Sequence, residues 1–152
     1  MNISTILVPI DFSDVSTKVV RMADELARAF GSRIVLLYVT EPEPEFVGFE
    51  PGPQSVRMAV ARDFAAEHQR LEEFKSLISG EGKDVLALHI QGPLVEKVLS
   101  QAKEQDASMI VMGSHGHGAL YSLLVGSVTS GVLKSATCPV VVVPADKSTA
   151  AQ

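Results

Sequence analysis

The stretch Met109–Val143 reads MIVMGSHGHGALYSLLVGSVTSGVLKSATCPVVVV, and it decides the fold. It opens with a continuous apolar run, Met109–Met112, and closes with a second, Pro139–Val143. Such runs are typical of strands that are buried on both faces of a parallel sheet. Between them lie a glycine-rich segment and a predicted helix from about Ser127 to Ser135. The stretch therefore predicts two strands joined through a glycine loop and a helix.

The chain before this stretch alternates in the same way. Apolar runs predict strands at Thr5–Pro9, Arg33–Val39 and Val85–Gln91. Apolar residues at helical spacing predict the helices between them, which we expect to run from an N-cap at Ser13 to Gly31, from Ser55 to Ser79, and from Pro93 as the first helical residue. Strands that alternate with helices favour a parallel sheet covered on both faces, with right-handed crossovers. In such sheets ligands bind beyond the carboxyl ends of the strands, where the strand order reverses.

Two segments stand outside this pattern. Glu41–Pro53 is rich in proline and glycine and predicts a loop, which is either a surface connection or a lid over a ligand. Residues 145–152 are small and polar and predict a flexible tail after a domain that spans residues 1–144.

Composition excludes several classes of function. Apolar residues make up 46% and charged residues 20% of the 152 residues, as in a globular domain. The net charge of −5 disfavours a nucleic-acid partner, because a phosphate backbone requires a basic face. The single cysteine, Cys138, cannot form an internal disulfide, and we expect it to be structural. No apolar run approaches the roughly 18 residues that span a bilayer, so we expect a cytoplasmic protein without a membrane partner.

The glycines gather after the fourth predicted strand. Four of the eleven lie between Gly113 and Gly126, whereas the motifs of P-loop and dinucleotide-binding proteins are absent. A glycine-rich turn lets backbone N–H groups approach an anion, and the start of the following helix adds unpaired N–H groups, with Ser127 and Thr129 as hydroxyl donors. The segment is therefore either a phosphate cradle or a long loop whose turns need glycine.

The spacing of these glycines forms a family motif. Gly113, Gly116 and Gly126 followed by Ser127 match the pattern G-x2-G-x9-G-[S/T], and the segments ILVPIDFSD, LLYV, MGSHG and GSVTSGVLKSATCPVVVVP accompany it. In all of these the chain resembles the ATP-binding universal stress proteins. The resemblance implies a three-layer α/β/α open sandwich with a five-stranded parallel sheet of order 3-2-1-4-5. This architecture is Rossmann-like and of the adenine nucleotide alpha hydrolase type.

The resemblance also implies which residues bind a nucleotide. Pro9, Ile10 and Asp11 would line the nucleoside end, where Asp11 would contact the ribose hydroxyls; its alternative role is to favour the dipole of the first helix. The backbone of Val39 would meet the adenine edge. Ribose and phosphate contacts would come from Met112, Gly113, Ser114, His115, Gly116, Gly126, Ser127, Val128 and Thr129.

Histidines occupy a position where the family often carries basic or polar side chains. His115 and His117 would strengthen phosphate binding when protonated, so affinity would rise as the pH falls. A metal site at these two residues is a poorer explanation, because no cysteine or cluster of carboxylates accompanies them. His68 and His89 have no obvious partners and are expected to be a solvated helix residue and an ordinary strand residue.

The predicted function is that of a nucleotide-binding module of the stress response, without a catalytic constellation. The expected ligand is ATP, or ADP or AMP, with Mg²⁺ as a possible companion. A homodimer is expected through the edge strand formed by Pro139, Val140, Val141, Val142 and Val143. The alternatives are a slow ATPase and an interaction protein with a vestigial pocket.

Overall fold

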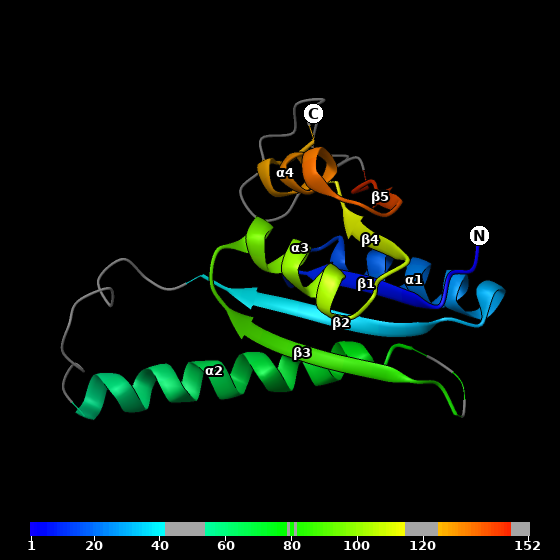
Figure 1. Ribbon diagram of the computed structural model, residues 1–152. Coiled ribbons are helices and arrows are strands. Elements are labelled where there is room, and N and C mark those ends of the chain that lie inside the picture. The colour runs from blue at the N-terminus through cyan, green and yellow to red at the C-terminus, as the bar shows by residue number, and fades with distance from the viewer. Residues whose placement is uncertain (42–53, 79, 81, 115–124, 147–152) are drawn as a thin grey trace, which may run out of the picture.

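The chain folds into one five-stranded sheet between two layers of helices (Figure 1). The computed structural model describes residues 1–41, 54–78, 80, 82–114 and 125–146. Its strands are β1 (Thr5–Ile10), β2 (Arg33–Thr40), β3 (Val85–Gln91), β4 (Met109–Gly113) and β5 (Val140–Val143). Its helices are α1 (Ser16–Phe30), α2 (Gln54–Lys75), α3 (Leu94–Glu104) and α4 (Ser127–Ser135). All neighbouring strands are parallel, and the order β3-β2-β1-β4-β5 confirms the predicted topology.

Both faces of the central strands β1, β2 and β4 are buried, which explains their continuous apolar runs. Side chains alternate along each strand, so Ile6 and Val8 of β1 pack toward α1 and α2. Leu7, between them, packs on the opposite face toward α3 and α4. All three side chains are fully buried.

The strand order reverses beside β1. β2 lies on one side of it, with Ile10 paired to Tyr38, and β4 lies on the other, with Leu7 paired to Ile110. Because the strands are parallel, the chain leaves all of them at the same edge of the sheet. Asp11, Glu41 and Ser114 directly follow β1, β2 and β4 at this edge.

Two predicted helix starts are wrong. α1 begins at Ser16 with Val15 at the N-cap, and the Ser13 hydroxyl, which would have to accept a backbone N–H to cap the helix, is buried without a partner among the described residues. Pro93 is the N-cap of α3 and not its first helical residue. The predicted end of α1 is confirmed, since Gly31 adopts the left-handed conformation with φ 68°.

α2 runs past the sheet at its N-terminal end (Figure 1). Its predicted apolar stripe is buried only at the C-terminal end, where Leu71 is fully buried, whereas Val60 and Phe64 are 44% and 41% exposed. The helix also ends at Lys75, before the predicted Ser79. Within the described chain, no helix combines the length and hydropathy needed to cross a bilayer.

Candidate functional site

A cleft of about 600 Å³ opens at the carboxyl edge of the sheet, where the strand order reverses. This volume is within the range of small-molecule sites, about 300–1,000 Å³. The ends of β1, β2 and β4 form its floor, and the first turns of α1, α3 and α4 form its walls. Its lining consists of Pro9, Ile10, Asp11, Val15, Ser16, Val19, Leu37, Tyr38, Val39, Thr40, Glu41, Leu94, Val98, Met112, Gly113, Gly126, Ser127, Val128 and Thr129.

The carboxylate of Asp11 is held by one of its two oxygens. Oδ1 accepts hydrogen bonds from the Ser13 backbone N–H at 3.0 Å and from the Ser16 hydroxyl at 3.2 Å. Among the described residues nothing donates to Oδ2. Asp11 therefore presents an oriented acceptor to any ligand in the cleft.

The turn that carries Asp11 is fixed by Phe12. Phe12 is not glycine, yet it lies in the left-handed region with φ 61°, which costs about 1–3 kcal/mol and persists only where packing enforces it. Its buried ring packs 4.2 Å from the ring of Tyr38, and the guanidinium of Arg70 lies 4.7 Å above it. These contacts from β2 and α2 hold the turn, and with it the carboxylate.

The start of α4 supplies unpaired backbone donors. The N–H groups of Ser127, Val128 and Thr129 have no acceptor within the part of the chain that the structure describes, as expected for the first turn of a helix. These three residues line the cleft, so the positive end of the helix dipole opens into it. The Thr129 hydroxyl is not free, because it donates to the Gly113 carbonyl at 2.8 Å.

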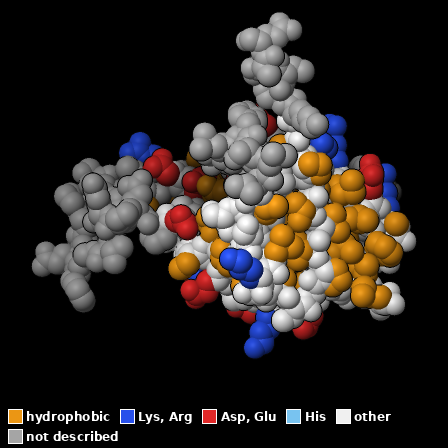
Figure 2. Space-filling view, turned by 90° about the horizontal axis from the view of Figure 1, so that it is seen from above, with side chains coloured by type: hydrophobic (Ala, Val, Ile, Leu, Met, Phe, Trp, Pro, Cys, Tyr) orange, Lys and Arg blue, Asp and Glu red, His pale blue; other side chains and the backbone are white. Residues whose placement is uncertain are grey.

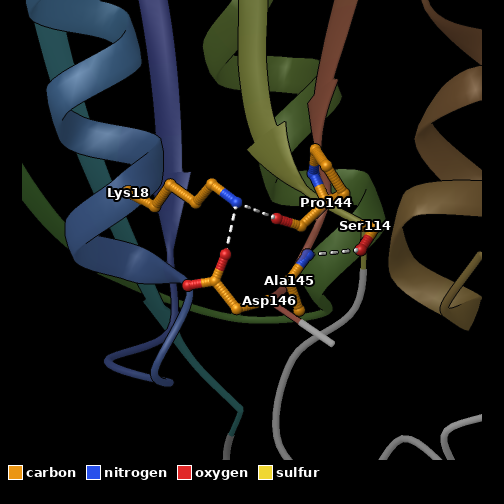
Figure 3. Close-up of polar contacts among 5 residues, drawn as sticks. All are labelled: Lys18, Ser114, Pro144, Ala145 and Asp146. Carbon is orange, nitrogen blue, oxygen red and sulfur yellow. Dashed lines mark hydrogen bonds and ion pairs between the residues drawn. The ribbon is translucent and has the colours of Figure 1, made fainter. Parts of the chain in front are cut away.

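Ser114 ties the end of β4 to three other segments. Its N–H donates to the Val143 carbonyl at 2.9 Å, and its carbonyl accepts from the Gly126 N–H at 2.8 Å. Its hydroxyl accepts from the Ala145 N–H at 3.4 Å (Figure 3). The two ends of the glycine segment are therefore joined directly to each other and to the end of β5.

Lys18 on α1 contacts the residues that follow β5. Its Nζ donates to the Pro144 carbonyl at 3.1 Å and forms an ion pair with Asp146 at 2.7 Å (Figure 3). The first two residues of the predicted tail, Ala145 and Asp146, thus contact the domain, and residues 147–152 lie outside the described residues. The division into a domain of residues 1–144 and a flexible tail stays a prediction.

A buried histidine lies behind the cleft, beneath α2. The side chain of His89 on β3 is 1% exposed and stacks on Phe64 with ring centroids 3.7 Å apart. Its Nε2 lies 2.7 Å from the Thr40 hydroxyl and 3.3 Å from Glu67, and the Thr40 hydroxyl donates to Glu67 at 2.9 Å. Nε2 therefore carries the proton that reaches Thr40, and the buried Nδ1 has no partner among the described residues.

Burial controls the ionisation of this cluster. It lowers the pKa of His89, since an added proton on Nδ1 would be desolvated, and this effect outweighs the opposing pull of Glu67. Burial and the nearby Glu67 raise the pKa of Tyr38, whose phenol donates to Glu67 at 3.2 Å. The prediction that these histidines lack partners is wrong for both, since His68 lies 3.9 Å from Glu72, but His68 is half exposed, as expected for a solvated helix residue.

Comparison with known proteins identifies this architecture. The model of the universal stress protein family matches residues 2–144. The chain belongs to the universal stress protein family. A universal stress protein of Thermus aquaticus, encoded in the QAH/OAS sulfhydrylase 3' region, is 34% identical over 139 residues, which are 91% of this chain and 97% of that protein. The solved structure of the hypothetical protein MJ0577 of Methanocaldococcus jannaschii has a TM-score of 0.80 and 26% identity, and the match covers 97% of this chain and 100% of that one.

Two other solved structures of universal stress proteins contain an adenine nucleotide. One is in complex with cAMP and has a TM-score of 0.66, 21% identity and coverage of 95% of this chain and 98% of that one. The other, from Archaeoglobus fulgidus, is in complex with dAMP and has a TM-score of 0.65, 23% identity and coverage of 93% and 98%. At these identities the likeness to this universal stress protein is one of fold.

Most of the residues predicted for the site lie in this cleft. Pro9, Ile10, Asp11, Val39, Met112, Gly113 and Gly126–Thr129 line it, and Ser114 lies at the base of the glycine segment. His115, Gly116 and His117 lie outside the described residues, as do residues 42–53 of the predicted loop or lid. The Thr129 hydroxyl, predicted as a donor to phosphate, donates to the Gly113 carbonyl in this structure.

Sequence analysis missed several residues of the cleft. Tyr38, Thr40 and Glu41 stand at the end of β2, and Leu94 and Val98 form an apolar wall on α3. The rule that ligands bind beyond the carboxyl ends of strands could have identified Thr40 and Glu41. Nothing in the sequence pairs α3 with the cleft, because that contact depends on how the helix packs.

The described residues supply neither a metal cluster nor a reactive thiol. Across them, no group of three His, Cys, Asp or Glu side chains is arranged to hold a metal ion. Burial raises the pKa of the Cys138 thiol, which keeps it protonated near neutral pH.

Proposed function

We propose that this universal stress protein binds an adenine nucleotide in the cleft at the carboxyl edge of its sheet. The observation that carries the proposal is the presence of two complementary groups in one cleft. The start of α4 offers unpaired N–H groups suited to a phosphate, and Asp11 offers a free carboxylate oxygen suited to a ribose hydroxyl. Relatives of the same fold that hold cAMP or dAMP support adenine as the base.

The proposed orientation of the nucleotide follows from the positions of these groups. The nucleoside lies against Pro9, Ile10, Asp11 and the backbone of Val39, and the phosphates lie toward Gly113–Gly116 and Gly126–Thr129. ATP is the nucleotide that the family resemblance implies, with Mg²⁺ as its companion, and ADP and AMP are the other candidates. Because none of the described residues that line the cleft forms a committed general base, the proposed role is regulatory binding and not rapid catalysis.

The regulatory module is proposed to be a homodimer that pairs through β5. This strand has a neighbour, β4, on one side only, so its outer edge carries unpaired backbone groups. Figure 2 looks down on the side of the molecule where β5 and α4 lie, and hydrophobic side chains gather there. Leu133 on this helix is 45% exposed. An apolar face beside an open strand edge supports self-association.

The test is a calorimetric titration of ATP, ADP, AMP and GTP, together with mass spectrometry of small molecules released from fresh protein. Gly126→Val should abolish most adenine nucleotide binding, because its side chain would enter the space beside the α4 N–H groups. The backbone at Gly126 has φ −58° and ψ 160°, so the strain expected for a left-handed glycine does not arise and the variant should fold. Unchanged affinity in folded Gly126→Val would place the ligand elsewhere.

The same samples distinguish the alternative functions. Sustained phosphate release that is lost in Asp11→Asn would establish a slow ATPase. A dimer that neither contains nor binds any nucleotide would establish an interaction protein with a vestigial pocket.

A further inference from the structure

One turn of α2 contacts two edges of the cleft from behind. Glu67 and Arg70 are three positions apart, so their side chains lie on the same face of the helix. Leu71 on this face is fully buried in the core and fixes the helix on the sheet. Neither Glu67 nor Arg70 belongs to the described lining of the cleft. Any effect of these two side chains on a ligand is therefore transmitted through the residues that they hold.

Glu67 holds the end of β2. Its Oε1 accepts a hydrogen bond from the Tyr38 hydroxyl at 3.2 Å, and its Oε2 accepts one from the Thr40 hydroxyl at 2.9 Å. The last residue pair between β1 and β2 is that of Ile10 with Tyr38. Beyond this pair, Val39 and Thr40 have β3 as their only strand neighbour. The carboxylate of Glu67 therefore fixes the strand end against which the proposed adenine base lies.

Arg70 holds the turn that follows β1. Its guanidinium lies 4.7 Å from the centroid of the Phe12 ring, and its Nη2 lies 3.5 Å from the Phe12 carbonyl oxygen. Phe12 has φ 61°, a conformation that persists only where the surrounding contacts enforce it. Asp11, the residue before Phe12, presents its Oδ2 from this turn. Arg70 therefore helps to fix the acceptor that is proposed for the ribose.

We propose that α2 controls the affinity of the cleft for adenine nucleotides, with Glu67 and Arg70 as positioning residues for its nucleoside end. The inference rests on the proposed function and adds a means of regulating that site. The helix reaches the base side through Thr40 and the ribose side through the turn of Asp11. A displacement of α2 would release both contacts together. Nucleotide affinity would then fall without any change in the residues that touch the ligand.

The experiment titrates wild type with AMP and with ATP by calorimetry at pH 8, where histidines are neutral, and follows the tighter ligand through the variants. We expect Glu67→Gln and Arg70→Met each to lower its affinity by about fivefold or more, as for other residues that act on a site without touching the ligand. Glu73→Gln and Arg62→Met are the matched controls, because they make the same changes on exposed residues of α2. Both controls should keep the affinity within about twofold of wild type.

Double-mutant cycles test whether each residue acts through its partner. Thr40→Val removes the hydroxyl that binds Glu67, so Glu67→Gln should cost little further affinity in that variant. Thr40→Ser restores the hydroxyl, so the loss caused by Glu67→Gln should return. Arg70→Met should likewise cost little further affinity in Asp11→Asn, because its effect passes through that carboxylate. A helix that merely stabilises the fold would instead give additive losses in both cycles, and this result would overturn the inference.

Urea unfolding of each variant shows whether it is folded under the conditions of the titration. If Glu67→Gln does not fold, the comparison of Thr40→Ser with Thr40→Val tests the same bond from β2, and Thr40→Ser should bind more tightly. Folded Glu67→Gln and Arg70→Met that bind as tightly as wild type would overturn the inference and leave the proposed function intact. Failure of wild type to bind either nucleotide would overturn the proposed function, and the inference with it.

Discussion

Asp11 has two tasks that a substitution can separate. Its Oδ1 holds the turn before α1, and its Oδ2 is available to a ligand. Asp11→Asn keeps an oxygen for Ser13 and Ser16 and replaces the free acceptor by an NH₂ donor. We expect this variant to fold normally and to weaken nucleotide binding by about 1–3 kcal/mol in calorimetry, the value of a hydrogen bond to a charged group.

The neighbouring Asp14 provides the control for this prediction. It is exposed and lies outside the cleft, so Asp14→Asn should leave the affinity unchanged. Equal affinities for wild type and Asp11→Asn would show that the carboxylate serves the turn alone.

His89 should make the free energy of unfolding depend on pH. Burial lowers its pKa in the folded state, so the unfolded chain binds a proton that the folded chain resists. The stability contributed by neutral His89 is therefore complete above the ordinary pKa of about 6.5 and is lost as the pH falls through the folded-state pKa. Urea unfolding between about pH 5 and 8 should show this loss in wild type.

Two variants assign this pH dependence to a residue. His89→Phe keeps an aromatic ring against Phe64 and should flatten the lower part of the profile. His68→Asn removes the half-exposed histidine of α2 and should retain the wild-type slope. A slope that persists in His89→Phe and disappears in His68→Asn would contradict the assignment.

At the scale of elements, one buried carboxylate joins α1 to the turn before β3. Asp24 is 6% exposed and forms ion pairs with Arg28 one helical turn later and with Lys83. Asp24→Ala should lower the free energy of unfolding by about 1–3 kcal/mol, because the charge-assisted hydrogen bonds are lost while both partners can still reach water. Glu25→Ala, on the exposed side of the same turn, should change stability by no more than about 0.5 kcal/mol in the same denaturant titration.

The elements also show what sequence could and could not predict. All five strands could be predicted from their apolar runs, which burial on both faces explains in β1, β2 and β4 and which partial burial accompanies in the edge strands β3 and β5. The start of α1 could not, because it depends on a side-chain bond from Asp11 and on the left-handed Phe12. The partners of His89 could not either, since Glu67 meets it only after α2 has packed on the sheet. The position of the cleft at the carboxyl edge of the sheet could be predicted, but the wall that α3 contributes to it could not.

At the scale of the whole molecule, the register of β5 decides how the proposed dimer can be tested. The carbonyls of Pro139 and Val143 bind β4, and in a parallel pair alternate residues face the same neighbour. Val140 and Val142 therefore direct their backbone groups to the open edge. Lysines at Val141 and Val143 would be a poor test, because Val143 is 3% exposed and Val141 packs against the same core.

Val142→Pro should yield a monomer in sedimentation equilibrium, because it removes an N–H group from the open edge and leaves the bonds to β4 in place. Val142→Thr keeps both the N–H group and the branched shape, so it should remain dimeric. A wild-type protein that is monomeric at tens of micromolar would contradict the dimer itself.

The junction at Ser114 has a consequence for protein engineering. Since the Gly126 N–H donates directly to the Ser114 carbonyl at 2.8 Å, the two ends of the intervening segment are held together. Because a backbone hydrogen bond fixes the two ends, doubling the number of residues between them costs only about 0.6 kcal/mol of closure entropy. The sequence between Gly116 and Gly126 can therefore serve as an insertion point, where we expect a reporter peptide or a small binding module to leave the scaffold folded.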